Sequence, residues 1–219
     1  LSLLARLAAP LDEGVRMAWV AMARTLLESA LESSRAKARL DTLEQSRRLQ
    51  QALYEIAELA GAEVEMSGML RRLHGIIAAL MYAPNCYLVT CDEDLRSVRF
   101  IYFADQVDTY VPAEEEEWTE RELPSSLTFG LLRHGQALRG PSAAVRQLLK
   151  VPRTDFQGPE AVDWLGVPMK RGDRVCGAIV VQSYDRTGCY SDEDRALLGY
   201  VAQHVLTTLD RRQAQAELE

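Results

Sequence analysis

The sequence predicts an α+β fold, in which an antiparallel sheet of five or six strands is flanked by helices and preceded by a long helix of the coiled-coil type. Three observations predict it. Apolar residues recur at helical spacing in the N-terminal quarter, strand pairs are joined by short polar turns, and another helical segment closes the chain. Strands paired by hairpins indicate an antiparallel sheet, and we expect the helices to pack on one side of it.

The composition is that of a soluble globular domain. The 219 residues are 47% apolar and 26% charged, and 25 basic against 32 acidic residues give a formal charge of -7. This acidic balance argues against nucleic acid and anionic membrane as partners, since both bind basic faces. No apolar run approaches the roughly 20 residues of a membrane span. The four cysteines form no C-x-x-C pair, so we expect reduced thiols in a cytoplasmic protein.

The first helix is expected from about Asp12 to Leu59. Its apolar positions alternate spacings of four and three, which is the heptad pattern of a dimer seam, with two serines in the middle: Val15, Trp19, Met22, Leu26, Ser29, Ser33, Ala36, Leu40 and Leu43. The pattern then changes phase and continues at Leu49, Leu53, Ile56 and Ala60. We therefore assign residues 1–50 to a helical dimerisation segment and residues 51–219 to a globular domain with a C-terminal signalling helix. Because the chain starts at Leu1 inside a helical run, we expect it to be a piece of a longer protein.

Further helices are predicted at Met66–Met81 and Leu127–Arg133, at Ser142–Leu149, and after a capping residue at Ser191. Strands are predicted at Cys86–Cys91, Val98–Phe103, Gln136–Leu138, Trp164–Met169 and Val175–Ser183. The last strand is apolar on both faces, which places it in the middle of the sheet. Between the second and third strands, the loop 104–126 contains four glutamates, Glu114 to Glu117, which we expect to be solvated.

Four stretches of the chain resemble the GAF domains, in particular those upstream of GGDEF diguanylate cyclases and sensor histidine kinases. They are L-Y-E-I-A-E-L-A from Leu53, L-T-F-G-L-L-R-H-G-Q-A-L from Leu127, D-W-L-G-V-P-M from Asp163, and G-A-I-V-V-Q-S-Y from Gly177 continuing through Y-S-D-E-D-R-A-L-L from Tyr190. The resemblance implies a GAF-like antiparallel sheet, a small-molecule pocket on one face, and dimerisation through the flanking helices.

The specialised chemistries of that family do not match this chain. The N-K-x-x-F-x-x-x-D-E pattern of its cyclic-nucleotide binders is absent, and no cysteine neighbours a histidine as in its bilin binders. Cys86 and Cys91 lie on a predicted strand, whereas the methionine sulfoxide reductases of the family carry their cysteines on a loop. We therefore predict no catalytic residues and name no cofactor.

Aromatic and polar side chains are the candidate ligand-binding residues, because pockets are mostly apolar with a few placed polar groups. They are Tyr87, Tyr102, Phe129, Trp164, Gln182 and Tyr184. Gln182 and Tyr184 are the best candidates, since they continue a buried strand and their side chains end in polar groups that need hydrogen-bond partners. The alternative is that these residues fill the core. His74, His134 and His204 have no metal-ligand spacing, so we predict no metal site.

Three functions remain open at this point. The first is a sensory module of a larger signal-transduction protein, which binds a small molecule and acts through a parallel homodimer. The second is an interaction module with a closed pocket, serving as a dimerisation spacer. The third is a thiol-based reductase, which requires a low-pKa cysteine facing the pocket.

Overall fold

The computed structural model describes residues 13–61, 65–108, 112–113, 116–153 and 159–216. The chain divides into two compact units, residues 1–50 and 51–219, and the helix α2 (Glu13–Gly61) runs from the first into the second. No helix in the described ranges is long and apolar enough to cross a membrane.

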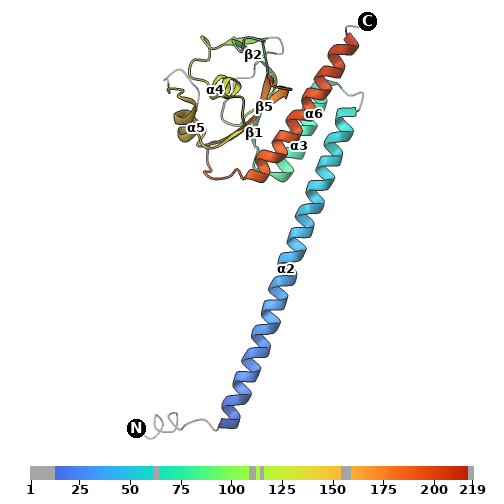
Figure 1. Cartoon of the computed structure of the whole chain (residues 1–219), viewed down its shortest axis with the longest axis vertical. Coiled ribbons are helices and arrows are strands. Elements are labelled where there is room, and N and C mark those ends of the chain that lie inside the picture. The colour runs from blue at the N-terminus through green and yellow to red at the C-terminus, as the bar shows by residue number, and fades with distance from the viewer. Residues whose placement is uncertain (1–12, 62–64, 109–111, 114–115, 154–158, 217–219) are drawn as a thin grey trace. The chain divides into compact units, whose positions relative to one another are not determined.

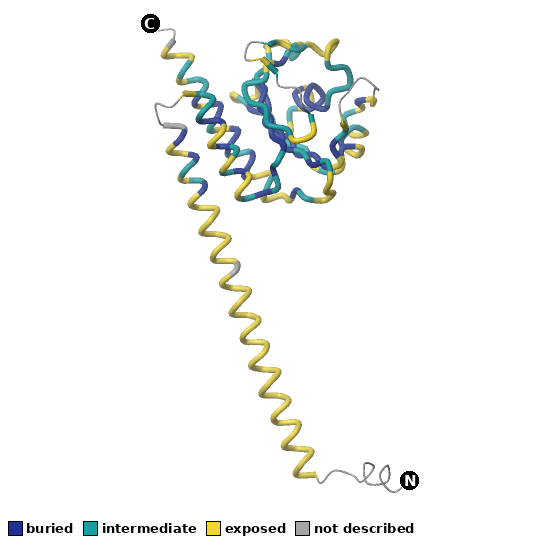
Figure 2. Tube along the Cα trace, turned by 180° about the vertical axis from the view of Figure 1, so that it is seen from behind, coloured by how far each residue is buried: buried dark blue, intermediate teal, exposed yellow. Residues whose placement is uncertain are grey.

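The part of α2 that precedes Gln51 is exposed along its whole length, as Figure 2 shows, wherever side chains are described. The expected long helix is confirmed, and the heptad residues lie on it. Its exposed large apolar side chains are Val15, Met17, Trp19, Val20, Met22, Leu26, Leu27, Leu31, Leu40, Leu43 and Leu49. Exposure of so many large apolar side chains on one helix is typical of a surface that another chain covers.

The second unit is built on a six-stranded antiparallel sheet, which confirms the predicted fold class. Its strand order is β3-β2-β1-β6-β5-β4. The strands are β1 (Asn85–Cys91), β2 (Ser97–Ala104), β3 (Glu117–Thr119), β4 (Leu138–Pro141), β5 (Asp163–Arg171) and β6 (Arg174–Ser183). As predicted, the apolar β6 lies inside the sheet, between β1 and β5.

Two strands differ from the sequence-based assignment. The strand expected at Gln136–Leu138 begins only at Leu138, because Gly135 ends the preceding helix in the left-handed conformation and Leu138 is the first residue to pair with β5. The three-residue strand β3 was not predicted. It lies in the long acidic loop and is held against β2, where Arg99 forms a 2.9 Å ion pair with Glu117. Glu114 and Glu115 lie outside the described residues.

Helices cover both faces of the sheet, so the expectation that they pack on one side is wrong (Figure 1). The end of α2, α3 (Met66–Leu80) and α6 (Asp192–Ala216) share one core with the sheet, while α4 (Leu127–His134) and α5 (Ser142–Leu149) share the other. The physical reason lies in β6, where Ile179 and Val181 face the first core, and Ala178 and Val180 face the second.

The change of phase in α2 marks where the helix joins the globular unit. Ala52, Ile56 and Leu59 are buried, and Leu53 packs beside them, whereas Leu49 is 41% exposed. The side chain of Ala60 lies outside the described residues. The packing of α2 on the domain thus begins near residue 52, slightly later than the apolar pattern suggested.

Candidate functional site

A pocket of about 220 Å³ lies on the α4 and α5 side of the sheet, and we call it the α4–α5 pocket. Strands β1, β2, β5 and β6 provide one wall, and the starts of the two short helices provide another. The lining residues are Tyr87, Phe100, Phe103, Asp108, Glu122, Leu123, Pro124, Ser126, Leu127, Thr128, Ser142, Arg146, Arg153, Pro159, Glu160, Ala161, Trp164, Gln182 and Tyr184. It is smaller than the pockets that hold drug-sized ligands.

An aromatic cluster forms the strand side of this pocket. Tyr87 lies 5.7 Å from Phe100 and 6.3 Å from Phe103 between ring centroids, and the two phenylalanines meet edge to face at 5.7 Å. Phe100 and Phe103 lie on the same face of β2 although they are three residues apart, because a bulge shifts the pairing of β2 with β1. At the bulge, Leu88 pairs with Tyr102 and the next residue, Val89, pairs with Phe100. This bulge gives the pocket two aromatic rings from one strand.

Asp105 ties the loop after β2 to the end of β6. Its Oδ2 atom accepts hydrogen bonds from Gln182 Nε2 and Tyr184 Oη, both at 2.9 Å, and its Oδ1 atom accepts from the backbone amides of Val107 and Asp108. Burial, followed by the Asp105 hydrogen bond, raises the pKa of Tyr184 well above its ordinary value, so the phenol stays a donor at neutral pH. The network therefore holds two pocket residues in fixed positions.

Charged residues gather near the start of α4. Arg146 donates from Nε to Glu160 at 2.6 Å and from Nη1 to the carbonyl oxygen of Ser125 at 2.7 Å, and Arg153 pairs with the other oxygen of Glu160 at 2.7 Å. Only 14% of the Arg146 side chain and 22% of the Glu160 side chain are exposed. Two guanidinium groups thus hold the Glu160 carboxylate, one at each of its oxygen atoms.

The first turns of α4 and α5 both line the pocket. Ser126 caps α4 by accepting from the amide of Thr128, whose hydroxyl lies 2.9 Å from the buried Tyr87 hydroxyl. Helix α5 has no side-chain cap, since Pro141 precedes it. Its first residue, Ser142, is 2% exposed, and its Oγ atom has no hydrogen-bond partner among the described residues. A buried hydroxyl without a partner is rare in native proteins.

Four of the six residues predicted to bind ligand come together in the pocket: Tyr87, Trp164, Gln182 and Tyr184. Tyr102 does not, because the bulge in β2 turns it to the opposite face, where its hydroxyl lies 2.7 Å from His74 Nδ1. Phe129 does not either. It is 1% exposed and packs in the core under α4, while its neighbour Thr128 lines the pocket.

Sequence reasoning missed Asp105, which bonds to two pocket residues, and it missed the lining residues Ser142 and Arg146. Asp105 lies two residues after the predicted strand Val98–Phe103, and polar residues near strand ends often meet others across a sheet, so its position carried a signal. Ser142 and Arg146 are one helical turn apart on a predicted helix, which places them on one face. Nothing in the sequence showed that this face closes a pocket.

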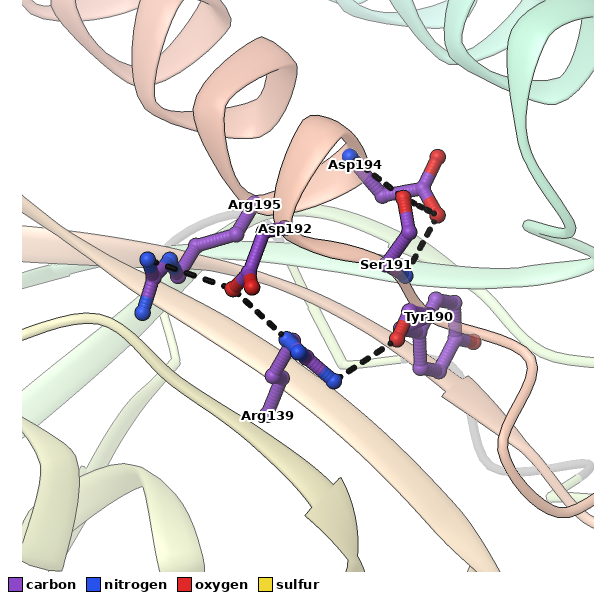
Figure 3. A network of polar contacts seen from close by, with 6 residues as sticks. All are labelled: Arg139, Tyr190, Ser191, Asp192, Asp194 and Arg195. Atoms are coloured by element: carbon purple, nitrogen blue, oxygen red, sulfur yellow. Dashed lines mark hydrogen bonds and ion pairs between the residues drawn. The ribbon is translucent and has the colours of Figure 1, made fainter.

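A polar network joins the edge strand β4 to the start of α6 (Figure 3). Arg139 on β4, three residues before Ser142, donates to Asp192 at 3.0 Å and to the backbone carbonyl oxygen of Tyr190 at 3.1 Å. Beside it, Ser191 and Asp194 form the predicted capping box, with Ser191 accepting from the Asp194 amide at 3.1 Å. Strand β4 is thus bonded to the first turn of the terminal helix.

The cysteines lie away from the pocket lining. Burial raises the pKa of the Cys86 and Cys91 thiols to about 12 in each case. Burial and a hydrogen bond to Asp163 raise the pKa of Cys189 to about 11. A thiol with so high a pKa is protonated at neutral pH and is a poor nucleophile.

Comparison with known proteins identifies the family. The GAF domain model matches residues 46–209. The chain belongs to the GAF family. The match includes all six strands and most of α6, and it begins in α2 shortly before the second unit starts. No curated protein sequence matches the chain.

Solved structures share the fold at low sequence identity. The GAF domain of a phosphoenolpyruvate-protein phosphotransferase from Coxiella burnetii is 13% identical, with a TM-score of 0.61 over 78% of this chain and 98% of that one. A free methionine-R-sulfoxide reductase from Neisseria meningitidis, in complex with its substrate, is 14% identical with a TM-score of 0.55 over 76% and 91%. Residues 122 to 287 of a methyl-accepting chemotaxis protein are 14% identical, with a TM-score of 0.53 over 71% and 95%.

Proposed function

We propose that this GAF domain is the sensory or regulatory module of a larger signal-transduction protein, that it binds a small molecule in the α4–α5 pocket, and that it passes the signal through its flanking helices. The observation that carries this proposal is the pocket itself, in which Asp105 fixes Gln182 and Tyr184 beside an aromatic wall. Ligand-binding pockets are typically lined by apolar side chains with a small number of polar groups held in fixed positions.

The route to the output follows from the contacts of Arg139. A ligand that moves the start of α5 also moves β4, which directly precedes it, and β4 is bonded to the first turn of α6 through Asp192. We propose that this junction has two arrangements and that ligand binding changes which of them is favoured. The terminal helix would have a different position in each arrangement.

We propose a diguanylate cyclase or a histidine kinase as the output domain, on the basis of the sequence resemblance. Reading the sequence after Glu219 tests this directly.

Ligand binding is tested by the melting temperature of the full chain across a panel of metabolites. A ligand present at 100 times its Kd stabilises the folded state by about 2.7 kcal/mol, which corresponds to roughly 5–10 °C for a domain of this size. For any ligand found, hydrogen exchange in the first turn of α6 should change in the native chain and not in Arg139→Ala. A panel without a single shift would favour the interaction module instead.

The proposed parallel homodimer is tested at the heptad seam. A cysteine placed at Ser33, a seam position, should form a disulfide-linked dimer at micromolar concentration under mild oxidation. Ser34→Cys is the matched control, because residue 34 is the next residue and lies outside the seam. Equal cross-linking of the two variants, or none of either, would contradict a parallel seam.

A thiol-based reductase is the less favoured alternative, although the fold is shared with one. The raised pKa values of Cys86, Cys91 and Cys189 and their positions outside the described pocket lining argue against it. Methionine sulfoxide reduction that persists after all four cysteines are replaced by alanine would eliminate thiol chemistry, whereas activity lost with a single cysteine would support it.

A further inference from the structure

The part of α2 that packs on the globular unit has two apolar faces. Ala52, Ile56 and Leu59 are buried. Because an α-helix turns by about 100° per residue, these three lie within roughly 60° of one another, and Tyr54 and Ala57 lie on the opposite side of the helix. Tyr54 and Ala57 are both exposed. The globular unit therefore covers one face of this part of α2 and leaves the other face open.

The open face continues the spacing of the proposed dimer seam. The seam positions alternate intervals of four and three residues up to Leu43. The same intervals, carried on along the sequence, pass two polar residues at 47 and 50 and then reach Tyr54 and Ala57. In this heptad pattern Ala52 and Leu59 both fall at position f, on the side of the helix that faces away from the seam. One helix can therefore bind a second helix with one face and its own domain with the other.

We propose that the dimer seam does not end at residue 50 but extends along the GAF domain, where Tyr54 and Ala57 contact the same residues of a second copy of this chain. This inference rests on the proposed parallel homodimer and extends its contact surface. The occupant of the open face is a second copy because a parallel two-fold pair of helices brings equal positions together. A seam that pairs the residues before position 50 thus continues onto Tyr54.

The two side chains suit a contact between helices. Alanine at a core position allows two helices to approach closely, and tyrosine supplies a large apolar ring. The Tyr54 hydroxyl already donates to Glu58 Oε1 of its own chain at 2.8 Å, so the ring can lose its contact with water without leaving the hydroxyl unsatisfied. The polar residues at 47 and 50 weaken the seam between its two parts. Tyr54 and Ala57 therefore form a separate apolar contact beside the domain.

The extended seam brings the dimer contact within one helix of the core that holds the terminal helix. Ile56 and Leu59 belong to the same core cluster as Val201 and Val205 of α6. A rotation of α2 that changes the packing of Ile56 also turns Tyr54, because both residues are on one helix. A rearrangement of α6 in this core therefore changes the contact between the two copies.

The first test is disulfide cross-linking of the full chain carrying Ala57→Cys, with Glu55→Cys as the matched control. Residue 55 lies about 160° away from residue 57 around the helix. Two cysteines form a disulfide only when their Cα atoms lie within about 7 Å. Under mild oxidation at micromolar concentration, Ala57→Cys should give at least about tenfold more covalent dimer than Glu55→Cys, after subtraction of any dimer that the native chain forms through its own cysteines. Equal yields from the two variants overturn the extended seam.

A second pair of variants measures the contact without a disulfide. Ala57→Glu places two carboxylates opposite each other in the proposed seam, so the Kd of the dimer, measured by analytical ultracentrifugation, should rise at least about tenfold. Ala78→Glu is the control, because it makes the same change at an exposed alanine of α3 and should leave the Kd unchanged. A Kd that Ala57→Glu leaves unchanged overturns the inference.

Unfolding separates this contact from the stability of the single chain. At protein concentrations below the Kd, where the copies are dissociated, Ala57→Glu should unfold as the native chain does. The same is expected after replacement of Tyr54, since both side chains are exposed in the single chain. A clear loss of stability in the dissociated chain would show that Ala57 supports the fold instead of the seam.

The failure of this inference is distinguishable from the failure of the proposed homodimer. If Ser33→Cys forms a covalent dimer and Ala57→Cys does not, the seam ends before the domain, and the homodimer stands. If neither variant forms a covalent dimer, the parallel homodimer and its extended seam both fail.

Discussion

Replacing Phe129 by alanine is expected to destabilise the GAF domain by about 3–5 kcal/mol, the usual cost of truncating a buried phenylalanine. The ring is 1% exposed and belongs to the core between α4 and the sheet, together with Leu131, Leu132 and Val180. Its removal leaves a cavity that a short helix anchored at both ends cannot close. Urea unfolding of the full chain, followed by circular dichroism, measures the loss.

Tyr54→Ala is the matched control for this variant. Tyr54 is also an aromatic residue on a helix, but it is 61% exposed, so its replacement should change the free energy of unfolding by less than about 0.5 kcal/mol. If Phe129→Ala instead unfolded like the native chain and weakened ligand binding, the ring would belong to the pocket after all, and our placement of it in the core would be wrong.

Gly177→Ala is expected to cost about 3 kcal/mol, at the upper end of the range for overpacked sites. A Cβ atom at residue 177 would overlap the backbone carbonyl oxygen of Val89 on the neighbouring strand, and it would lie 2.6 Å from Met169 Cε and 3.1 Å from Thr90 Cα. The methionine can move away, but the backbone of β1 cannot, because it is paired with both β2 and β6. The central strands would have to separate locally.

Gly199→Ala provides the control for the glycine replacement. A Cβ atom at residue 199, in α6, meets nothing within 4 Å, so alanine should stabilise the helix by about 0.5–1 kcal/mol. The two variants make the same chemical change with opposite expected signs, which thermal unfolding resolves easily. A Gly177→Ala chain as stable as the native one would show that β1 and β6 can move apart at this point.

The elements were predictable from the sequence because each rests on local chemistry. Heptad spacing defines α2, Ser191 and Asp194 define the start of α6, and Gly172, with a φ of 59°, allows the tight turn between β5 and β6. The double-sided apolar pattern of β6 also predicted its place inside the sheet. The strand β3 was not predictable, since three residues in an acidic loop carry no periodicity and pair only because β2 is already in place.

The candidate site shows the same division between local and tertiary information. That Tyr87, Trp164, Gln182 and Tyr184 share a face follows from strand alternation, which a sequence displays. That Tyr102 faces α3 follows from a bulge in the pairing of β1 and β2, which only the folded sheet displays.

The sequence by itself therefore determined the family, the long helix and the strands, because the spacing of apolar residues and the turn chemistry act over a few residues. Only the tertiary structure decided that α4 and α5 cover the second face of the sheet, that Asp105 bonds to Gln182 and Tyr184, and that Ser142 is buried with no hydrogen-bond partner for its hydroxyl among the described residues. Those features depend on contacts between residues up to about 80 positions apart, and no local pattern encodes which residues such contacts join.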